Sequence, residues 1–234
     1  MQNADRLGIQ IVANGLVLPE YTKDGKTYIA APWNTDYQIR ILVPSISGYR
    51  HTYKRFKTVI SVDGLDVMTG KRASAHATGY VMTPPSRPTA NDILGFRLSD
   101  SEVASFHFGD RTDSYAALLE KPEHIGVIGI VFYSELDPEP CMYETTRGCD
   151  GGETTRGATR GGHDMGTEFG RRREQVVSKT YFDTDREVAR FVLEYASSDS
   201  LKKAGIITNS PAPLGAVNAF PEDTGCKPPK GWRG

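Results

Sequence analysis

Three residues with the side chains of a hydrolytic triad lie close together in the sequence. His107 can act as a base, Asp110 can orient it, and Ser114 can act as a nucleophile. A nucleophilic serine usually stands on a strained turn within a G-x-S-x-G motif, which this sequence lacks. Ser114 instead precedes a short predicted helix, where serine is a preferred N-cap. We therefore predict that Ser114 caps a helix and that the chain is not an enzyme.

Two carboxylates flank a glycine in the segment 62–67. Asp63 and Asp66 could contribute to a calcium or sugar site, because hard cations prefer clustered oxygen ligands. A calcium loop continues with further oxygen donors at regular spacing, and none follows here. In turns, Asp side chains commonly accept hydrogen bonds from nearby backbone amides. A turn is the favoured interpretation of Asp63 and Asp66, and an ion site is the alternative.

The three cysteines do not indicate a metal site. Cys141 and Cys149 are separated by seven residues, whereas paired zinc ligands are usually separated by two to four. A single His163 does not complete such a set, and Cys226 is distant in the sequence. Free thiols are expected, with a Cys141–Cys149 disulfide as the alternative in an oxidising compartment. No phosphate-binding glycine loop precedes a helix, so we predict neither a metal nor a cofactor.

The segment 137–174 is rich in glycine and arginine and contains the sequence Glu-Thr-Thr-Arg-Gly twice. Its few large apolar residues cannot bury enough surface to offset the entropy of ordering it. Its eight acidic and six basic side chains nearly balance, which argues against direct nucleic-acid binding. Arginine forms bidentate contacts at protein interfaces. We predict a flexible insert that docks on a neighbouring subunit, with these interface residues: Arg147, Arg156, Arg160, Arg171, Arg172 and, from the C-terminal arm, Trp232.

Alternation of apolar and polar residues predicts β-strands along most of the chain. Asn14-Gly15 and Asp24-Gly25 are hairpin turn sequences between such runs. The run 126–133 is apolar on both faces, which is typical of a central strand covered on both sides. Further strands or ordered segments are predicted at 37–43, 57–62, 67–68, 79–82, 93–98, 103–108, 175–182 and 187–195.

About ten short strands with almost no helix indicate an all-β fold, an antiparallel β-sandwich of the jelly-roll type. Two short helices are expected, at 114–120 and at 201–204, the second capped by Ser198 or Asp199 and closed by Gly205. The predicted organisation is the main part of the sandwich at 7–136, the flexible insert at 137–174, the remaining strands and a helix at 175–208, and an extended Pro/Gly-rich arm at 209–234.

Composition restricts the function further. Lys plus Arg number 28 and Asp plus Glu number 29, and this balance argues against a general nucleic-acid or membrane-surface binder. No apolar run reaches the roughly 18 residues that a membrane-spanning helix needs. The polar start of the sequence, residues 1–6, predicts no signal peptide.

A series of short motifs runs through the chain: 61–67 followed by Gly70, then 79–81, 95–97, 114–116, 126–129, 166–170, 188–195, 201–205 and the closing Pro228-Pro229 with Gly231-Trp232. As a group, over residues 9–234, they resemble a family of uncharacterised β-rich proteins encoded by bacteria and phages. The resemblance implies a compact β-rich domain with a variable Gly-rich insert. It implies no reaction and no catalytic residues.

These features favour a structural or interaction protein of a virus particle, such as a capsid decoration, head-fibre or tail component. Its expected partners are copies of itself and capsid or tail proteins, and its expected location is the virion, after synthesis in the host cytoplasm. Loops and arms of this kind add contact area on neighbouring subunits. The alternative is a carbohydrate- or surface-binding module in the bacterial cytoplasm or on the cell surface, with sugars stacking on exposed residues among Trp33, Tyr37, Tyr49, Tyr53, Tyr21 and Trp232.

Overall fold

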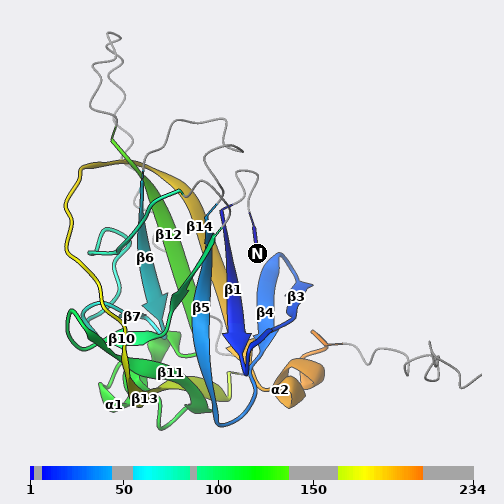
Figure 1. Cartoon of the computed structure of the whole chain (residues 1–234). Coiled ribbons are helices and arrows are strands. Elements are labelled where there is room, and N and C mark those ends of the chain that lie inside the picture. The colour runs from blue at the N-terminus through cyan, green and yellow to red at the C-terminus, as the bar shows by residue number, and fades with distance from the viewer. Residues whose placement is uncertain (3–6, 44–54, 85–88, 137–162, 208–234) are drawn as a thin grey trace, which may run out of the picture.

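The structure is a computed structural model, and it describes residues 1–2, 7–43, 55–84, 89–136 and 163–207. Two seven-stranded sheets pack against each other through one shared hydrophobic core (Figure 1). Sheet A has the order β10-β11-β5-β1-β2, with β13 paired to β11 and β9 paired to β5. Its strands are β1 (Gly8–Ala13), β2 (Leu16–Val17), β5 (Thr35–Val43), β9 (Thr89–Ile93), β10 (Gly95–Arg97), β11 (Glu102–Asp110) and β13 (Met165–Glu174).

Sheet B has the order β3-β4-β14-β12-β6-β7, with β8 paired to β6. Its strands are β3 (Glu20–Lys23), β4 (Lys26–Ala30), β6 (Phe56–Val62), β7 (Leu65–Asp66), β8 (Tyr80–Met82), β12 (Val127–Glu135) and β14 (Thr184–Ala196). The helical elements of the described chain are short: α1 (Tyr115–Leu118), the 3₁₀ turn η2 (Pro122–His124) and α2 (Ser198–Lys203). The predicted all-β sandwich is confirmed.

The core lies between the inner faces of the two sheets. Ile39 of sheet A and both Ile128 and Ile130 of sheet B are completely buried in it. The ring of Tyr37 stacks on that of Phe108, with ring centroids 3.9 Å apart. Each large apolar side chain buried in this way contributes about 1.5–3 kcal/mol to stability. The apolar residues that recur at every second position therefore face inward from both sheets, and their burial stabilises the packing of the two layers.

Three two-residue turns have the backbone of a tight hairpin. Asn14-Gly15, Asp24-Gly25 and Asp63-Gly64 all have φ between 52° and 76° at both positions. Two consecutive positive φ angles characterise the type I′ turn, whose twist matches that of the flanking strands. The two predicted hairpins are confirmed, and the third turn connects β6 to β7.

The predicted flexible insert is wrong for its last ten residues. Met165–Glu174 forms β13, which pairs with β11 from Met165 opposite Asp110 to Glu174 opposite Glu102. Only the first three residues of β13 are buried, because the strand lies at the edge of sheet A. An edge strand needs few apolar residues and often carries charges that discourage pairing with other chains. Of the rest of the insert, His163 and Asp164 are described and hydrogen-bond to Tyr195 and Ser197, and residues 137–162 lie outside the described residues.

The strand β14 adds a parallel pair to the predicted antiparallel sandwich. It pairs with β12 in antiparallel fashion and with β4 in parallel, from Leu193 opposite Thr27 to Ala196 opposite Ala30. The predicted segment 175–182 contains no strand. The predicted strand 93–98 is interrupted at Leu94, and its two parts pair with β5 and β11 respectively.

Serine side chains cap both α-helices. Ser114 Oγ accepts a hydrogen bond from the Ala117 amide at 3.2 Å, as predicted. The N-cap of α2 is Ser197 rather than the predicted Ser198 or Asp199, and the predicted Gly205 follows the helix with φ of 63°. None of the helices in the described chain has the length and hydropathy that a membrane crossing requires.

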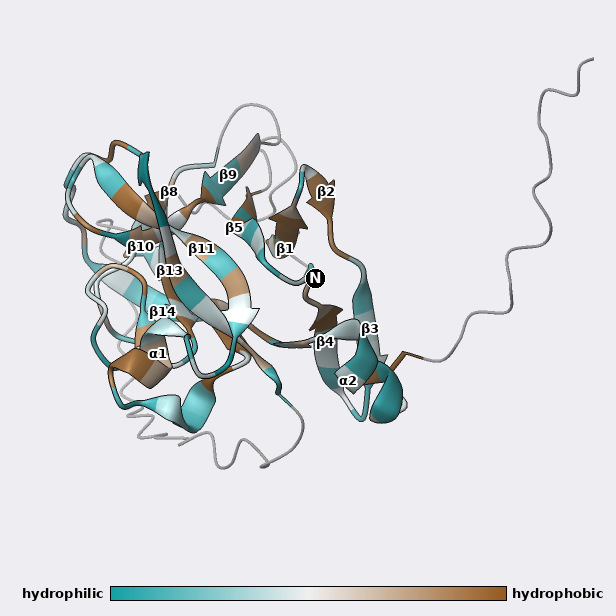
Figure 2. Cartoon of the chain, turned by 90° about the horizontal axis from the view of Figure 1, so that it is seen from below, coloured by the Kyte–Doolittle hydropathy of each residue, from teal (hydrophilic) through white to brown (hydrophobic). Residues whose placement is uncertain are grey.

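The outer faces of the two sheets differ in polarity. On sheet A, Arg40 donates to Asp92 from Nε and Nη2 at 2.7 and 3.0 Å. Hydrophilic and hydrophobic residues alternate along β11 and β13 (Figure 2). On sheet B the outer face carries a second apolar cluster made of Val59, Val131 and Tyr133. The strand β12 is therefore buried on both faces from Ile130 to Ser134, as predicted, while Val127 and Gly129 on its outer face are partly exposed.

Candidate functional site

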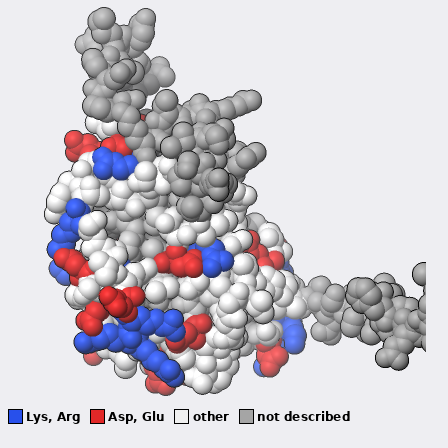
Figure 3. Space-filling model, in the orientation of Figure 1, with Lys and Arg blue, Asp and Glu red and all other residues white. Residues whose placement is uncertain are grey.

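A polar groove of about 610 Å³ lies on the outer face of sheet A, and we call it the sheet A groove. Three strands and two turns contribute to it: β5, β11, β13, the turn at Asn14 and the loop before β5. Its lining residues are Asn14, Asn34, Thr35, Asp36, His107, Glu168, Gly170, Arg171 and Arg173. Lys and Arg side chains are interspersed with Asp and Glu side chains at the lower end of the molecule, where β11 and β13 lie (Figure 3).

Strand pairing places the central groups of this groove. His107 of β11 stands opposite Asp36 of β5 and opposite Glu168 of β13. Both neighbours of His107, Phe106 and Phe108, point into the core, so the imidazole must point outward. Directly opposed residues in a sheet bring their side chains into contact. One histidine and two carboxylates are thus lined up across three adjacent strands.

Hydrogen bonds fix the positions of these groups. His107 Nδ1 lies 2.7 Å from Asp36 Oδ1, and His107 Nε2 lies 3.0 Å from Asn34 Oδ1. Arg173 donates to Asp36 Oδ2 at 2.7 Å. Partial burial alone raises the pKa of Asp36, but the hydrogen bonds from His107 and Arg173 together lower it below its usual value. Asp36 is therefore a fixed anion between two donors.

Arg171 differs from its neighbours in the sheet A groove. It is exposed and makes no ion pair with any described residue. Arg173 is held by Asp36, and Arg172 lies 3.6 Å from Glu102 on an exposed part of the strand. Arg171 is thus the guanidinium of this strand that is available to a partner. Of the predicted interface residues, Arg147, Arg156, Arg160 and Trp232 lie outside the described residues, as do Cys141, Cys149 and Cys226.

The structure does not assemble the hydrolytic triad. Ser114 is completely buried and donates to the Arg111 carbonyl at 2.8 Å. Asp110 accepts hydrogen bonds from the amide and hydroxyl of Thr112, and His107 faces Asp36 instead. Asp110 and Ser114 therefore have local structural partners, as predicted for Ser114, and His107 pairs with Asp36 of another strand.

The two aspartates at 63 and 66 have different roles. Asp66 accepts hydrogen bonds from the amides of Met68 and Thr69 at 3.2 and 2.9 Å, which is the predicted local turn. Asp63 is almost completely buried, so the local turn interpretation is wrong for its side chain. The described residues hold no group of three side chains suited to a metal ion.

Asp63 instead joins three segments far apart in the sequence. Its carboxylate accepts hydrogen bonds from the amides of Gly126 and Thr167 at 2.9 and 2.8 Å and from the hydroxyl of Tyr195 at 2.7 Å. Burial raises the pKa of Asp63 to about 6, although these hydrogen bonds act in the opposite direction. The hydroxyl of Thr167 bridges Tyr195 and Tyr37 at 2.7 and 2.8 Å. The result is a buried polar network that connects the two sheets.

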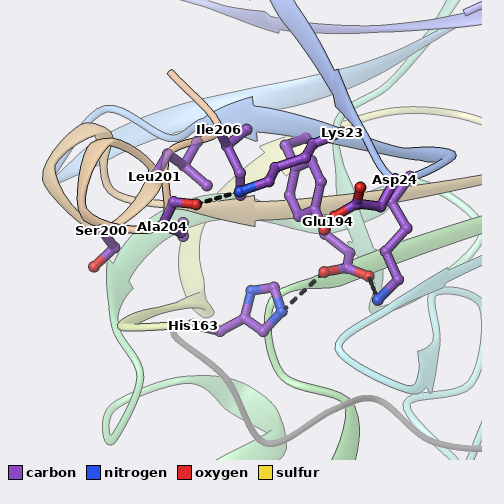
Figure 4. Close-up of a pocket in the computed structure, with 11 residues that line it drawn as sticks. Lys23, Asp24, His163, Glu194, Ser200, Leu201, Ala204 and Ile206 are labelled. Carbon is purple, nitrogen blue, oxygen red and sulfur yellow. Dashed lines mark hydrogen bonds and ion pairs between the residues drawn. The ribbon is translucent and has the colours of Figure 1, made fainter. Parts of the chain in front are cut away.

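A smaller pocket of about 200 Å³ lies between β4, β14 and α2 (Figure 4). Glu194 pairs with Lys26 at 2.7 Å and lies 3.3 Å from His163 Nε2. The other ring nitrogen of His163 lies 3.0 Å from the Tyr195 carbonyl, and Lys23 donates to the Ala204 carbonyl at 2.6 Å. The hydrogen bond to Glu194 raises the pKa of Lys26. Because these groups are already paired with one another, we interpret the pocket as a structural contact between β4, β14 and α2 rather than as a reactive site.

No family model matches the chain, and comparisons with curated proteins and with solved structures find no similar protein. The resemblance to β-rich bacterial and phage proteins therefore stays a prediction.

The residues of the sheet A groove that the sequence did not single out come from β5, from the loop before it and from β13, where they are Glu168 and Arg173. Asp36 alternates with the buried Tyr37, and this alternation already indicated a polar face on β5. The pairing of that face with His107 and Arg173 depends on strand order, which the alternation does not contain. The groove was therefore detectable as a polar surface but not as a site.

Proposed function

We propose that this chain is a non-enzymatic interaction protein that docks through the sheet A groove in a larger assembly, such as a virus particle. The observation that supports this most is the exposed Arg171 beside the fixed Asp36, His107 and Arg173. Groups held in place before binding lose little side-chain entropy when a partner arrives. Arg171 offers a planar pair of donors that suits a carboxylate. The partner would present acidic and hydrogen-bonding groups on a convex surface.

Co-sedimentation tests this proposal. The source material is separated on a density gradient, and the ratio of this chain to co-sedimenting proteins is measured by quantitative mass spectrometry. We expect a fixed ratio to a capsid or tail protein. Recovery only as free protein of low mass would overturn the proposal.

A charge reversal then locates the interface. We expect Arg171→Glu to weaken incorporation into the assembly at least tenfold, because it places like charges opposite each other. Lys71→Glu reverses another exposed cation, which lies outside the groove, and should leave incorporation unchanged. Equal incorporation of both variants would exclude the groove as the docking surface.

Carbohydrate binding is the second candidate, and one observation favours it. Trp33 is 62% exposed in the loop that also contributes Asn34 to the sheet A groove. An aromatic face beside amide and carboxylate groups can stack on a sugar ring while its hydroxyls are hydrogen-bonded. Tyr37, a predicted stacking residue, is buried in the core and cannot serve. Tyr49, Tyr53 and Trp232 lie outside the described residues.

A glycan-binding measurement decides this second candidate. If the groove binds saccharides, Trp33→Ala should lower the affinity at least tenfold, while Trp33→Phe should retain most of it because the aromatic face persists. Loss of binding in both variants, or an affinity that is unchanged in both, would reject stacking on Trp33.

A further inference from the structure

A second groove, of about 360 Å³, runs over the outer face of sheet B, and we call it the sheet B groove. Its floor is β12 at Gly129 and Val131, and one wall is the segment 72–75. The opposite wall includes Val192 of β14, which is 46% exposed. The lining of the groove is therefore mainly apolar.

A missing side chain creates the floor of this groove. A Cβ atom at position 129 would lie 2.8 Å from Ser61 Oγ, and nothing else is within 4 Å of it. The glycine thus leaves space above β12 between Val127 and Val131, the valines on the same face of the strand. A slot of this kind over an apolar strand accommodates an extended peptide better than a compact ligand.

The charge of the groove is positive. The cations Lys26, Arg72 and Arg190 and the carboxylate of Glu194 line the groove. Their formal net charge is +2 with histidine neutral. Lys26 is paired with Glu194, and Arg190 is paired with Glu187 outside the lining. Arg72 makes no ion pair with any described residue. An occupant with apolar side chains and two acidic groups would complement this lining.

The chain leaves the described structure close to this groove. Ile206 lines the pocket of Figure 4, and that pocket shares Lys26 and Glu194 with the sheet B groove. The segment 208–223 follows directly. An extended chain advances about 3.3 Å per residue, so ten residues span about 33 Å, more than the distance across a small groove.

The composition of 208–223 matches the groove. The segment contains Leu214, Val217 and Phe220, and its only charged residues are Glu222 and Asp223. Its two carboxylates complement Arg72, the cation of the lining that makes no ion pair with a described residue. Its prolines disfavour helix and limit the entropy that an extended conformation loses on binding. Attachment to the same domain raises the effective concentration to the millimolar range, so a weak intrinsic affinity suffices.

We propose that residues 208–223 bind in the sheet B groove of their own chain, with apolar side chains over Gly129 and Val131 and the acidic pair at Arg72. The bound segment covers the apolar outer face of sheet B and leaves the sheet A groove free for partners. This places the binding of the chain's own C-terminal segment and the binding of partners on opposite faces of the sandwich.

Site-specific photo-crosslinking in the full chain tests the proposal. A benzoylphenylalanine at position 220 is irradiated, and the linked peptides are identified by mass spectrometry. We expect crosslinks within one chain, to β12, to β14 or to residues 72–75. A product of twice the chain mass would instead assign the groove to the segment of a second copy, and the proposal would be wrong in that respect. Links only to other surfaces would overturn it entirely.

Two matched variants separate groove binding from general proximity. Val192→Asp puts a charge into the wall of the groove and is expected to lower the crosslink yield at least fivefold. Val176→Asp makes the same change at a valine that is 70% exposed and does not line the groove, so the yield should not change. Both side chains are exposed, so neither variant is expected to unfold the chain. Equal yields in the two variants would contradict the proposal.

Discussion

Replacing Asp63 by alanine is expected to lower the free energy of unfolding at pH 7 by roughly 3 kcal/mol. The change leaves three buried donors without an acceptor, the amides of Gly126 and Thr167 and the hydroxyl of Tyr195. Each unpaired buried donor costs about 1–3 kcal/mol, and the relief from burying a charged carboxylate offsets part of the sum. Urea unfolding monitored by intrinsic fluorescence measures the difference.

The same carboxylate makes stability depend on pH in a definite direction. Its pKa is raised by burial from 3.8 to about 6 in the folded protein. Between these values the folded state holds a proton that the unfolded state has released, so the contribution of Asp63 to stability falls as pH rises. This proton-linked part of its contribution is fully present below about pH 4 and is lost by about pH 6 to 7, while the hydrogen bonds accepted by the carboxylate remain. The shift corresponds to about 3 kcal/mol at 1.36 kcal/mol per pH unit.

The effect of Asp63 must be measured as a difference between two variants, because other carboxylates change the free energy of unfolding with pH in the opposite direction. The pKa values of Asp36, Asp164 and Glu187 are lowered, so their contributions are lost as pH falls. The comparison is therefore wild type against Asp63→Asn at each pH. The stability advantage of the wild type should be largest near pH 4 and shrink towards pH 7. A constant difference across this range would show that Asp63 does not titrate there.

Gly95→Ala is expected to be the most damaging single-methyl change in sheet A. A Cβ at position 95 would lie 1.9 Å from the carbonyl oxygen of Ala104 and 2.5 Å from its carbonyl carbon. These are backbone atoms of the paired strand β11, so the clash is relieved only by separating β10 from β11. We expect a loss of about 3 kcal/mol or more, or failure to fold. Thermal and urea unfolding of the purified variant measure it.

Gly15→Ala is the control for this prediction. Gly15 has φ of 76° and no atom within 4 Å of its Cβ position, so only backbone strain of about 1–2 kcal/mol applies. Gly95 has no positive φ, so its effect comes from the clash alone. If the two variants lose the same stability, close packing at Gly95 is not what requires a glycine.

Local sequence patterns predicted the strands and turns that depend on neighbouring residues. Asn14-Gly15 and Asp24-Gly25 determine their turns through their own φ preferences, and alternation determined the inward faces of β5 and β11. The pattern failed at β13, where pairing with β11 stabilises a strand with few buried residues. Segments of this kind become strands because a partner strand is present, and a single sequence does not show the partner.

The sites were less predictable than the fold for the same reason. Asp63 was identified as a residue of interest, but its partners at 126, 167 and 195 follow from how the two sheets face each other. His107 and Asp36 meet only because β11 pairs with the start of β5. Arg171 was predicted as an interface residue from composition, and the structure adds that Arg173 beside it is already engaged by Asp36.

The parallel pairing of β4 with β14 also affects the order in which the chain can fold. Residues 27–30 can form their parallel pairing only with residues 193–196. The strand β14, which contains these residues, lies between β4 and β12 in sheet B. During synthesis, the early hairpin β3–β4 and the later strands β6 and β12 are therefore kept apart until about residue 196 has emerged. Contacts between such distant residues slow folding and leave strand edges exposed for longer. A nascent chain that stalls before β14 would present two open sheet edges, which makes it a natural client for chaperones.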